Sequence, residues 1–366
     1  MRQRHVDRPL ALLIGILVIA GAFVFASAAL GLLARGALHM TSVAFNHVVL
    51  GIGLGLVALT VGAFFDYRKW RKFAPYLFVL ALIATAAVFL PYIGVEHGGG
   101  RRWLMIFGTS FQPSEALKIA TIMMMAAYFS LIKSKVLSYV HGLGGFLAIL
   151  ALPALIMVAQ PDLGTLGIIT ISCLAIFIAA GARWQHFFAV LLIGIITLGA
   201  LAFMRPYVLD RVMTFFNPAV GQHDQSYQIR QSLIAIGSGG VTGRGFGQGI
   251  QKFTYLPEPM GDSIFAVAAE ELGFIGATGI VLLFLAFSIR GMTIGARAPD
   301  EFGALLAVGL AAYLGSEAFI NIAAMLGLAP LTGVPLTFMS QGGSAMLASL
   351  AAAGILLNIS RHRVRK

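Results

Sequence analysis

Ten apolar runs of about 20 residues constrain this chain more than any other feature. They lie near 9–33, 45–65, 74–93, 114–132, 143–159, 163–181, 185–204, 263–289, 303–328 and 336–359. An α-helix rises about 1.5 Å per residue, so it needs about 20 apolar residues to cross the hydrocarbon core of a bilayer. The sequence therefore predicts an all-α polytopic membrane protein with about ten transmembrane helices.

The composition agrees with a membrane protein. Of the 366 residues, 59% are hydrophobic and 11% are charged, whereas about 25% of residues are charged in soluble domains. The single cysteine, Cys173, lies in an apolar run, which excludes a disulfide framework and a cysteine-based metal site. The net charge is +11, and in such a chain basic residues usually set topology or meet anionic lipids. We expect membrane lipid, and no nucleic acid, among the binding partners.

The distribution of basic residues predicts the topology. With both termini in the cytoplasm, roughly sixteen of the 25 Lys and Arg residues fall in cytoplasmic segments and about eight outside, as the positive-inside rule requires. This topology places three polar segments on the outer side, namely 96–115, 160–162 and 205–262. The chain shows no internal repeat or linker, so we expect residues 1–366 to form a single domain.

The segment 205–262, between the seventh and eighth predicted spans, is the only long polar interval, and it predicts a large extracytoplasmic loop. It ends at Asp262, immediately before an apolar run resumes. A carboxylate at the point where a loop enters the bilayer is half desolvated, which costs free energy unless the group is paired or used. We therefore hypothesise that Asp262 is the working group of a membrane enzyme.

The first of the three outer segments, 96–115, contains cations and an acid. Arg101 and Arg102 precede Ser114 and Glu115 at the start of a predicted helix, and Lys118 follows Glu115 at i+3 on the same face. One interpretation is a local ion pair and a helix cap. The other is a cationic pocket of Arg101, Arg102 and Lys118 that suits a phosphate or pyrophosphate, because guanidinium forks match phosphate oxygens.

Asp162 also has two interpretations. It follows Pro161 between two predicted spans, and Asp is a favoured N-cap whose charge suits a helix N-terminus. If helix packing brings Asp162 near Glu115 and Lys118, it becomes a second acid that orients the lysine or holds a divalent cation through oxygen ligands.

Glycine gathers at 237–249 in the long loop, but its spacing matches neither a P-loop nor a dinucleotide fingerprint. We interpret these glycines as tight turns at the membrane surface. Apolar residues at 233–236 beside polar ones favour a short amphipathic helix in the interface. Glu271, deep in the following span, is either paired structurally or functional. Glu317 and Asn321 are predicted to hydrogen-bond between helices.

Several motifs, in order along nearly the whole chain, together resemble one family, the SEDS bacterial cell-wall polymerases FtsW and RodA. They are Phe111-Gln-Pro-Ser-Glu115, Gln160-Pro-Asp-Leu-Gly-Thr165, Gln231-Ser-Leu-Ile-Ala-Ile-Gly-Ser-Gly-Gly240, Tyr255-Leu-Pro-Glu258 with Asp262, Gly333-Val-Pro-Leu336 and Ser340-Gln-Gly-Gly-Ser344. The segment from Gly247 to Phe253 is more similar to FtsW.

The resemblance implies an activity and partners. The expected activity is that of a peptidoglycan glycosyltransferase, which polymerises lipid II, a disaccharide pentapeptide on undecaprenyl pyrophosphate, at the outer face of the bacterial cytoplasmic membrane during division or elongation. The expected partners are a class B penicillin-binding transpeptidase and other divisome or elongasome proteins. No cofactor is required by the chemistry, and a Mg or Mn ion near Glu115 and Asp162 is the alternative.

The resemblance also implies site residues. Asp262 matches the family's essential loop aspartate and is predicted to be the general base, while Glu115, Lys118 and Asp162 match polar positions that line the central cavity. The predicted substrate-binding residues are Arg101, Arg102, Glu115, Lys118, Asp162, Arg230, Gln231, Ser232 and Lys252.

This chain departs from the family pattern at a few positions. Pro259-Met260-Gly261 stands where the family usually has Ala-His-Thr, and Gln341 stands where it usually has Tyr. Two other functions compete with the polymerase. A lipid II flippase or transporter would also need intramembrane charges, but the sequence shows no inverted repeat and its polar residues collect on one side. The third hypothesis is a non-enzymatic scaffold for division proteins.

Overall fold

The structure is a computed structural model that describes residues 6–34, 45–97, 100–106, 109–216 and 224–362. The elements of the first half are α1 (Arg8–Ala34), η1 (Asn46–Gly53), α3 (Leu54–Phe64), α4 (Tyr67–Ala86), η2 (Ala87–Phe89), β1 (Gly94–His97), β2 (Gly100–Ile106), β3 (Thr109–Phe111), α5 (Pro113–Ile132), η3 (Lys133–Leu137), η4 (Tyr139–Gly144), α6 (Gly145–Ala159) and α7 (Leu163–Ala179). Those of the second half are α8 (Trp184–Met204), α9 (Pro206–Phe216), α10 (Asp224–Ser238), α11 (Gln251–Thr254), α12 (Ile264–Ala296), α13 (Glu301–Met325) and α14 (Gly343–Arg361).

The helices confirm the predicted membrane architecture. Within the described ranges, nine helical segments are long and apolar enough to cross a membrane, and α7, with 17 residues, is a tenth and shorter apolar helix. Two spans begin elsewhere than predicted. α4 begins early because Asp66 caps it by accepting from the backbone N–H of Arg68 (3.0 Å). α14 begins only at Gly343, because the residues before it form a turn.

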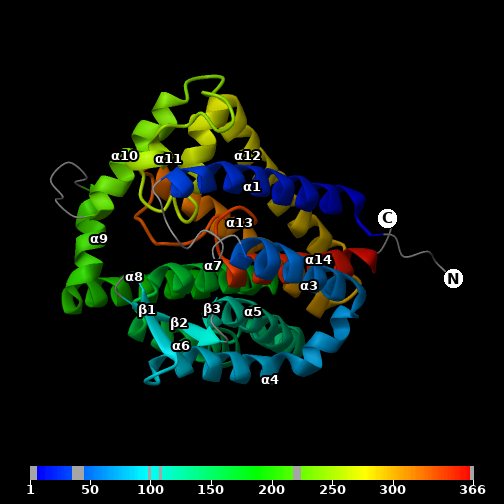
Figure 1. The fold of residues 1–366 in the computed structure, drawn as a ribbon. Coiled ribbons are helices and arrows are strands. Elements are labelled where there is room, and N and C mark those ends of the chain that lie inside the picture. The colour runs from blue at the N-terminus through cyan, green and yellow to red at the C-terminus, as the bar shows by residue number, and fades with distance from the viewer. Residues whose placement is uncertain (1–5, 35–44, 98–99, 107–108, 217–223, 363–366) are drawn as a thin grey trace.

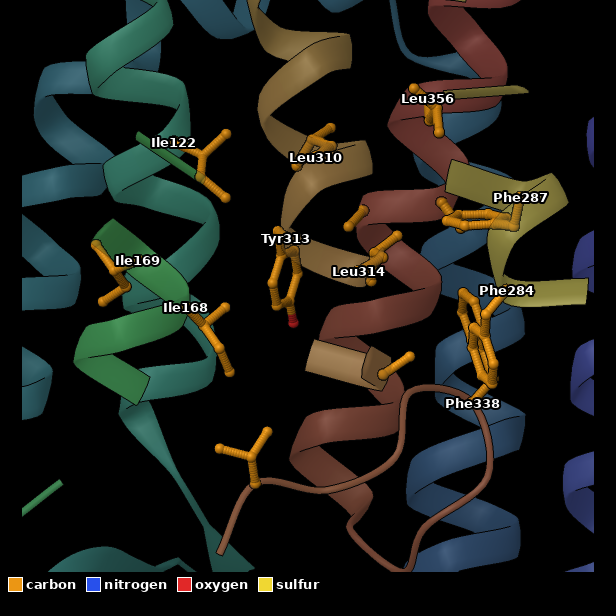
Figure 2. Close-up of a cluster of buried hydrophobic side chains, with 14 of the residues drawn as sticks. Ile122, Ile168, Ile169, Phe284, Phe287, Leu310, Tyr313, Leu314, Phe338 and Leu356 are labelled. Carbon is orange, nitrogen blue, oxygen red and sulfur yellow. The ribbon is translucent and has the colours of Figure 1, made fainter. Parts of the chain in front are cut away.

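The core of the bundle lies around α13 and α14, the two most buried of the nine spans, with 72% and 78% of their apolar windows buried. Figure 2 shows Leu310 and Tyr313 of α13 between Ile122 and Ile168 on one side and the side chains near Phe287 on the other. The helices approach closely at Gly309, where an added Cβ would lie within 3 Å of side chains of α5 and α7. Small residues permit such crossings in membrane bundles.

The outer segment after α4 forms a small antiparallel sheet with strand order β1-β2-β3, which sequence analysis did not predict. Val95 pairs with Trp103 across the first ladder, and Met105 pairs with Ser110 across the second. In Figure 1 the sheet lies at the same end of the bundle as α9, α10 and α11, whereas α1 begins and α14 ends at the opposite end. The predicted large loop is therefore a folded segment that contains three helices.

Candidate active site

Asp262 lies in a turn between α11 and α12, and its backbone is fixed from three directions. The carbonyl of Glu258 accepts from Gly261 N (3.0 Å) and from Ser263 N (3.2 Å), which closes the turn. Ser340 Oγ donates to the carbonyl of Gly261 (2.8 Å), and Asn321 Nδ2 of α13 donates to the carbonyl of Asp262 (2.9 Å). Because these bonds use backbone atoms, they position the Asp262 carboxylate without occupying it.

The half-buried Asp262 lines a cavity of about 610 Å³, a size typical of ligand pockets. Four charged residues line it: Arg102 of β2, Arg211 of α9, and Glu258 and Asp262 of the turn before α12. The other lining residues that matter here carry amides or hydroxyls or are leucines: Ser110, Gln112, Gln225, Gln228, Gln341, Ser344, Leu50, Leu54, Leu331 and Leu347. The cavity thus combines acids, cations, neutral polar groups and apolar side chains.

The surroundings of Asp262 make it a suitable base at neutral pH. It lies outside the spanning helices, and burial, followed by the nearby charge of Glu258, raises the pKa of the Asp262 carboxyl to about 7. Arg211 and Arg102 act in the opposite direction. A general base works best with a pKa near the operating pH, because it is then both ionised and basic enough to accept a proton.

Arg102 is held by the turn between α6 and α7. Its Nε donates to the carbonyl of Gln160 (3.2 Å), its Nη2 donates to the carbonyl of Pro161, and its Nη1 lies 4.0 Å from Asp162 Oδ1. Asp162 itself caps α7, since it accepts from Thr165 N (3.2 Å) and Thr165 Oγ1 (2.9 Å). The predicted cap is confirmed, and the cation that Asp162 meets is Arg102.

Lys118 lies inside the bundle and does not line the cavity. Only 1% of its side chain is exposed, and its Nζ lies 2.9 Å from Glu115 Oε2 and 2.5 Å from Glu317 Oε1. The i, i+3 ion pair is confirmed, and the interhelical role predicted for Glu317 is also met, with Lys118 as its partner. Arg101 is exposed on β2. Of the three cations in the predicted pocket, the structure brings Arg102 to Asp262.

The remaining predicted binding residues also lie away from the cavity lining. Lys252 is buried, and its Nζ contacts Glu271 Oε1 (2.5 Å) and Ser27 Oγ (2.6 Å). Arg230 is exposed on α10, Gln231 is half-buried beside it, and Ser232 is buried with its hydroxyl 3.4 Å from the Met325 sulfur. The ion pair between Lys252 and Glu271 joins α11 to α12, which favours the structural interpretation of Glu271.

Sequence reasoning missed two of the four charged lining residues, Glu258 and Arg211. Glu258 stands four residues before Asp262, and this spacing in a tight turn was a usable signal. Arg211 had none, because it lines the cavity only through the tertiary placement of α9, which lies between α8 and α10 at the sheet end of the bundle.

The structure offers no shared cation site for Glu115 and Asp162. Glu115 faces Lys118, whereas Asp162 faces Thr165 and Arg102. Within the part of the chain that is described, no group of three or more His, Cys, Asp or Glu side chains gathers closely enough to hold a metal. A divalent cation therefore remains a prediction from the sequence, and these two carboxylates do not fit it.

The fold and the site together define a multi-pass membrane protein with a carboxylate-bearing cavity at one end of its bundle. Residues 8–365 match the cell cycle protein family of the FtsW, RodA and SpoVE type. The chain belongs to this SEDS family and is FtsW-like.

Two relatives and two solved structures illustrate the match. Stage V sporulation protein E of Bacillus subtilis (strain 168) is 39% identical over 310 residues, 85% of each chain. A probable peptidoglycan glycosyltransferase FtsW of Geobacter sulfurreducens is 39% identical over 317 residues, 86% of this chain and 83% of the relative. A chain of a peptidoglycan synthase complex superposes with TM-score 0.79 at 23% identity and 99% coverage of both chains. The crystal structure of the Thermus thermophilus rod shape determining protein RodA gives 0.71 at 25% identity, covering 99% and 98%.

Proposed function

We propose that this protein is a peptidoglycan glycosyltransferase that polymerises lipid II into glycan strands. The relatives named as FtsW support this activity. The observation that carries the proposal is the placement of Asp262, a half-buried carboxylate with a pKa raised to about 7, in one cavity with two guanidinium groups. A base beside cations is what a transfer between a sugar hydroxyl and a sugar diphosphate requires.

The reaction is a single inverting displacement. Asp262 accepts the proton of the GlcNAc 4-hydroxyl as that oxygen bonds to the MurNAc anomeric carbon. The bond from that carbon to the phosphate oxygen breaks, and its electron pair leaves with undecaprenyl pyrophosphate. Arg102 stabilises the negative charge that develops on the leaving diphosphate. No nucleotide is needed because the donor sugar is already activated, and the lipid tails confine both reactants to the membrane.

We place the cavity at the outer face of the bacterial cytoplasmic membrane, with both termini in the cytoplasm. The distribution of basic residues supports this orientation. The arrangement of the bundle is consistent with it, because the start of α1 and the end of α14 lie together at the end opposite to the sheet and α9 to α11.

We propose a class B penicillin-binding transpeptidase as the partner that crosslinks the new glycan, within a divisome or elongasome. A structural neighbour comes from a complex described as coordinating polymerization and crosslinking, which supports a two-enzyme assembly. The FtsW-like relatives favour a role in cell division.

The decisive test replaces Asp262 in the purified protein. We expect Asp262→Asn to reduce lipid II polymerisation by on the order of 10²- to 10⁴-fold, the usual contribution of a general base. Asp210→Asn is the matched control, because Asp210 is an exposed acid on α9, and it should retain activity. Glycan length is measured on gels with labelled lipid II. Polymerisation by Asp262→Asn at the wild-type rate would disprove the assignment.

Further arms of the same assay address the partner, the cation and the competing functions. Adding the transpeptidase tests whether it is needed, and EDTA followed by Mg or Mn tests the predicted divalent cation. A flippase would move lipid II across liposomes without making glycan. A scaffold would do neither.

A further inference from the structure

Two arginines reach the Asp262 cavity from different elements. Arg102 comes from β2 and Arg211 from α9. Arg102 is fixed by the carbonyls of Gln160 and Pro161 and faces the Asp162 carboxylate at 4.0 Å. Its position is therefore set by the turn between α6 and α7, independently of any ligand.

Arg211 is in a different situation. Its guanidinium carbon lies 5.9 Å from the ring centroid of Tyr207, one helical turn earlier. Within the described residues, no carboxylate oxygen approaches the Arg211 guanidinium within the 4.0 Å of an ion pair. It is half-buried and lines the cavity. Its charge is thus held in a partly desolvated place, and none of the described side chains supplies a close counter-ion.

The electrostatics of the cavity favour an added anion beside Arg211. Burial, followed by the charge of Arg102, lowers the pKa of the Arg211 guanidinium, and the attraction of Asp162 and Asp262 does not compensate for this. Two like charges that face one cavity repel each other, and an anion between them removes that cost. Glu258 and Asp262 line the same cavity and repel an anion, so the favourable positions for it are those close to the two arginines.

We propose that Arg211 is a diphosphate-binding residue, which together with Arg102 grips the leaving group of the lipid-linked donor; this inference rests on the proposed function for its biological meaning. A guanidinium matches two oxygens of one phosphate. Two guanidiniums carried by separate elements therefore suit two linked phosphates better than one. As the bond between the sugar and the phosphate oxygen breaks, the electron pair remains on that oxygen, and Arg211 stabilises the added charge.

The binding test uses inorganic pyrophosphate and the full-length protein in zwitterionic nanodiscs, measured by calorimetry. We expect Arg211→Gln to weaken pyrophosphate binding by about 10- to 100-fold, as for the loss of a charge-assisted hydrogen bond. Arg205→Gln is the matched control, because Arg205 is exposed just before α9, and its affinity should not change. Equal affinity of Arg211→Gln and wild type, or no binding by wild type, would overturn the inference.

Arg211→Lys gives a second test that does not depend on the fold of the glutamine variant. Lysine keeps the charge but lacks the fork, so the preference for pyrophosphate over phosphate should fall by about 10-fold. An unchanged preference for pyrophosphate over phosphate would contradict the proposal that Arg102 and Arg211 bind the two linked phosphates together.

The phosphate that binds Arg211 could instead belong to the headgroup of an anionic phospholipid, which carries one phosphate. Turnover by wild type and Arg211→Gln is therefore compared in zwitterionic nanodiscs and in nanodiscs with phosphatidylglycerol. We expect kcat to fall in both. A loss confined to the anionic nanodiscs would assign Arg211 to the membrane surface and refute a substrate role. If wild type binds pyrophosphate but makes no glycan, the proposed function fails while the binding assignment stands.

Discussion

At the scale of single residues, the site depends on two acids placed four positions apart in one turn. Glu258 adopts a positive φ of 45°, a strained conformation for a residue with a side chain. Its carbonyl receives the two N–H groups that close the turn. The turn therefore holds Glu258 and Asp262 in the same cavity, where the charge of the first makes ionisation of the second more difficult.

This pair predicts a shift in the pH dependence of turnover. The rate of a general base rises as the base loses its proton, so wild-type kcat should rise through about pH 7. Glu258→Gln removes a charge that raises the pKa of Asp262, so we expect the rise to move to lower pH. The measurement is kcat against pH between 5 and 9, with Glu301→Gln as an exposed control on α13. A profile that stayed in place, or moved to higher pH, would contradict the coupling.

Local chemistry explains which site residues the sequence could predict. The Asp162 cap and the pair of Glu115 and Lys118 depend on neighbours within a few positions, where spacing is informative. Asp262 was predicted from its place at the end of the polar segment, whereas the contacts that hold it, from Asn321 and Ser340, are distant in sequence. The burial of Lys118 between Glu115 and Glu317, and of Lys252 beside Ser27, depends on contacts across about 200 residues of chain. The spacing of residues along the sequence does not predict contacts of this kind.

At the scale of elements, the glycine-rich part of the long loop is joined to a break in α12. Gly273 has φ 68° and ψ −168°, outside the helical region. Loop and helix exchange backbone hydrogen bonds around it, from Arg244 to the carbonyl of Glu270 (3.1 Å) and from Phe274 to the carbonyl of Gly240 (2.9 Å). The loop thus satisfies backbone groups that the break leaves unpaired, and it fixes the chain shortly before the Asp262 turn.

We expect Gly273→Ala to disrupt this junction. A Cβ at position 273 would lie 2.2 Å from Gly243 N, and the positive φ disfavours any side chain. The loss should be at least about 2 kcal/mol, visible as a lower melting temperature and lower activity. Gly279→Ala on the same helix is the control, because a Cβ there meets nothing within 4 Å. Equal melting temperatures for the two variants would exclude the proposed junction.

Whole elements were easier to predict than the connections between them. Each spanning helix satisfies its own backbone groups and needs only a long apolar run, so its presence can be inferred locally. The sheet escaped prediction because its strands have only 4, 7 and 3 residues and depend on one another for pairing. The delayed start of α14 depends on contacts of the preceding turn with Met260 and Gly261.

At the scale of the whole molecule, the proposed orientation can be tested by thiol labelling. The only cysteine, Cys173, is buried, so we expect no maleimide labelling of the wild-type protein. Val241 is 65% exposed in the long loop, and Arg71 is exposed near the start of α4. We expect a membrane-impermeant maleimide to label Val241→Cys in spheroplasts and to label Arg71→Cys only after permeabilisation. Labelling of Arg71→Cys in sealed spheroplasts would show that the proposed topology is reversed.

The span α8 is the least enclosed of the nine, with 6% of its apolar window buried among the described residues. Few protein contacts among the described residues hold this span, so the match between its apolar length and the thickness of the bilayer contributes to its tilt. Only Arg205 separates α8 from α9, which bears Arg211. Bilayer thickness would in this way become a control on the separation of cation and base, so that the polymerase would respond to the length of the lipids around it as well as to the lipid it consumes.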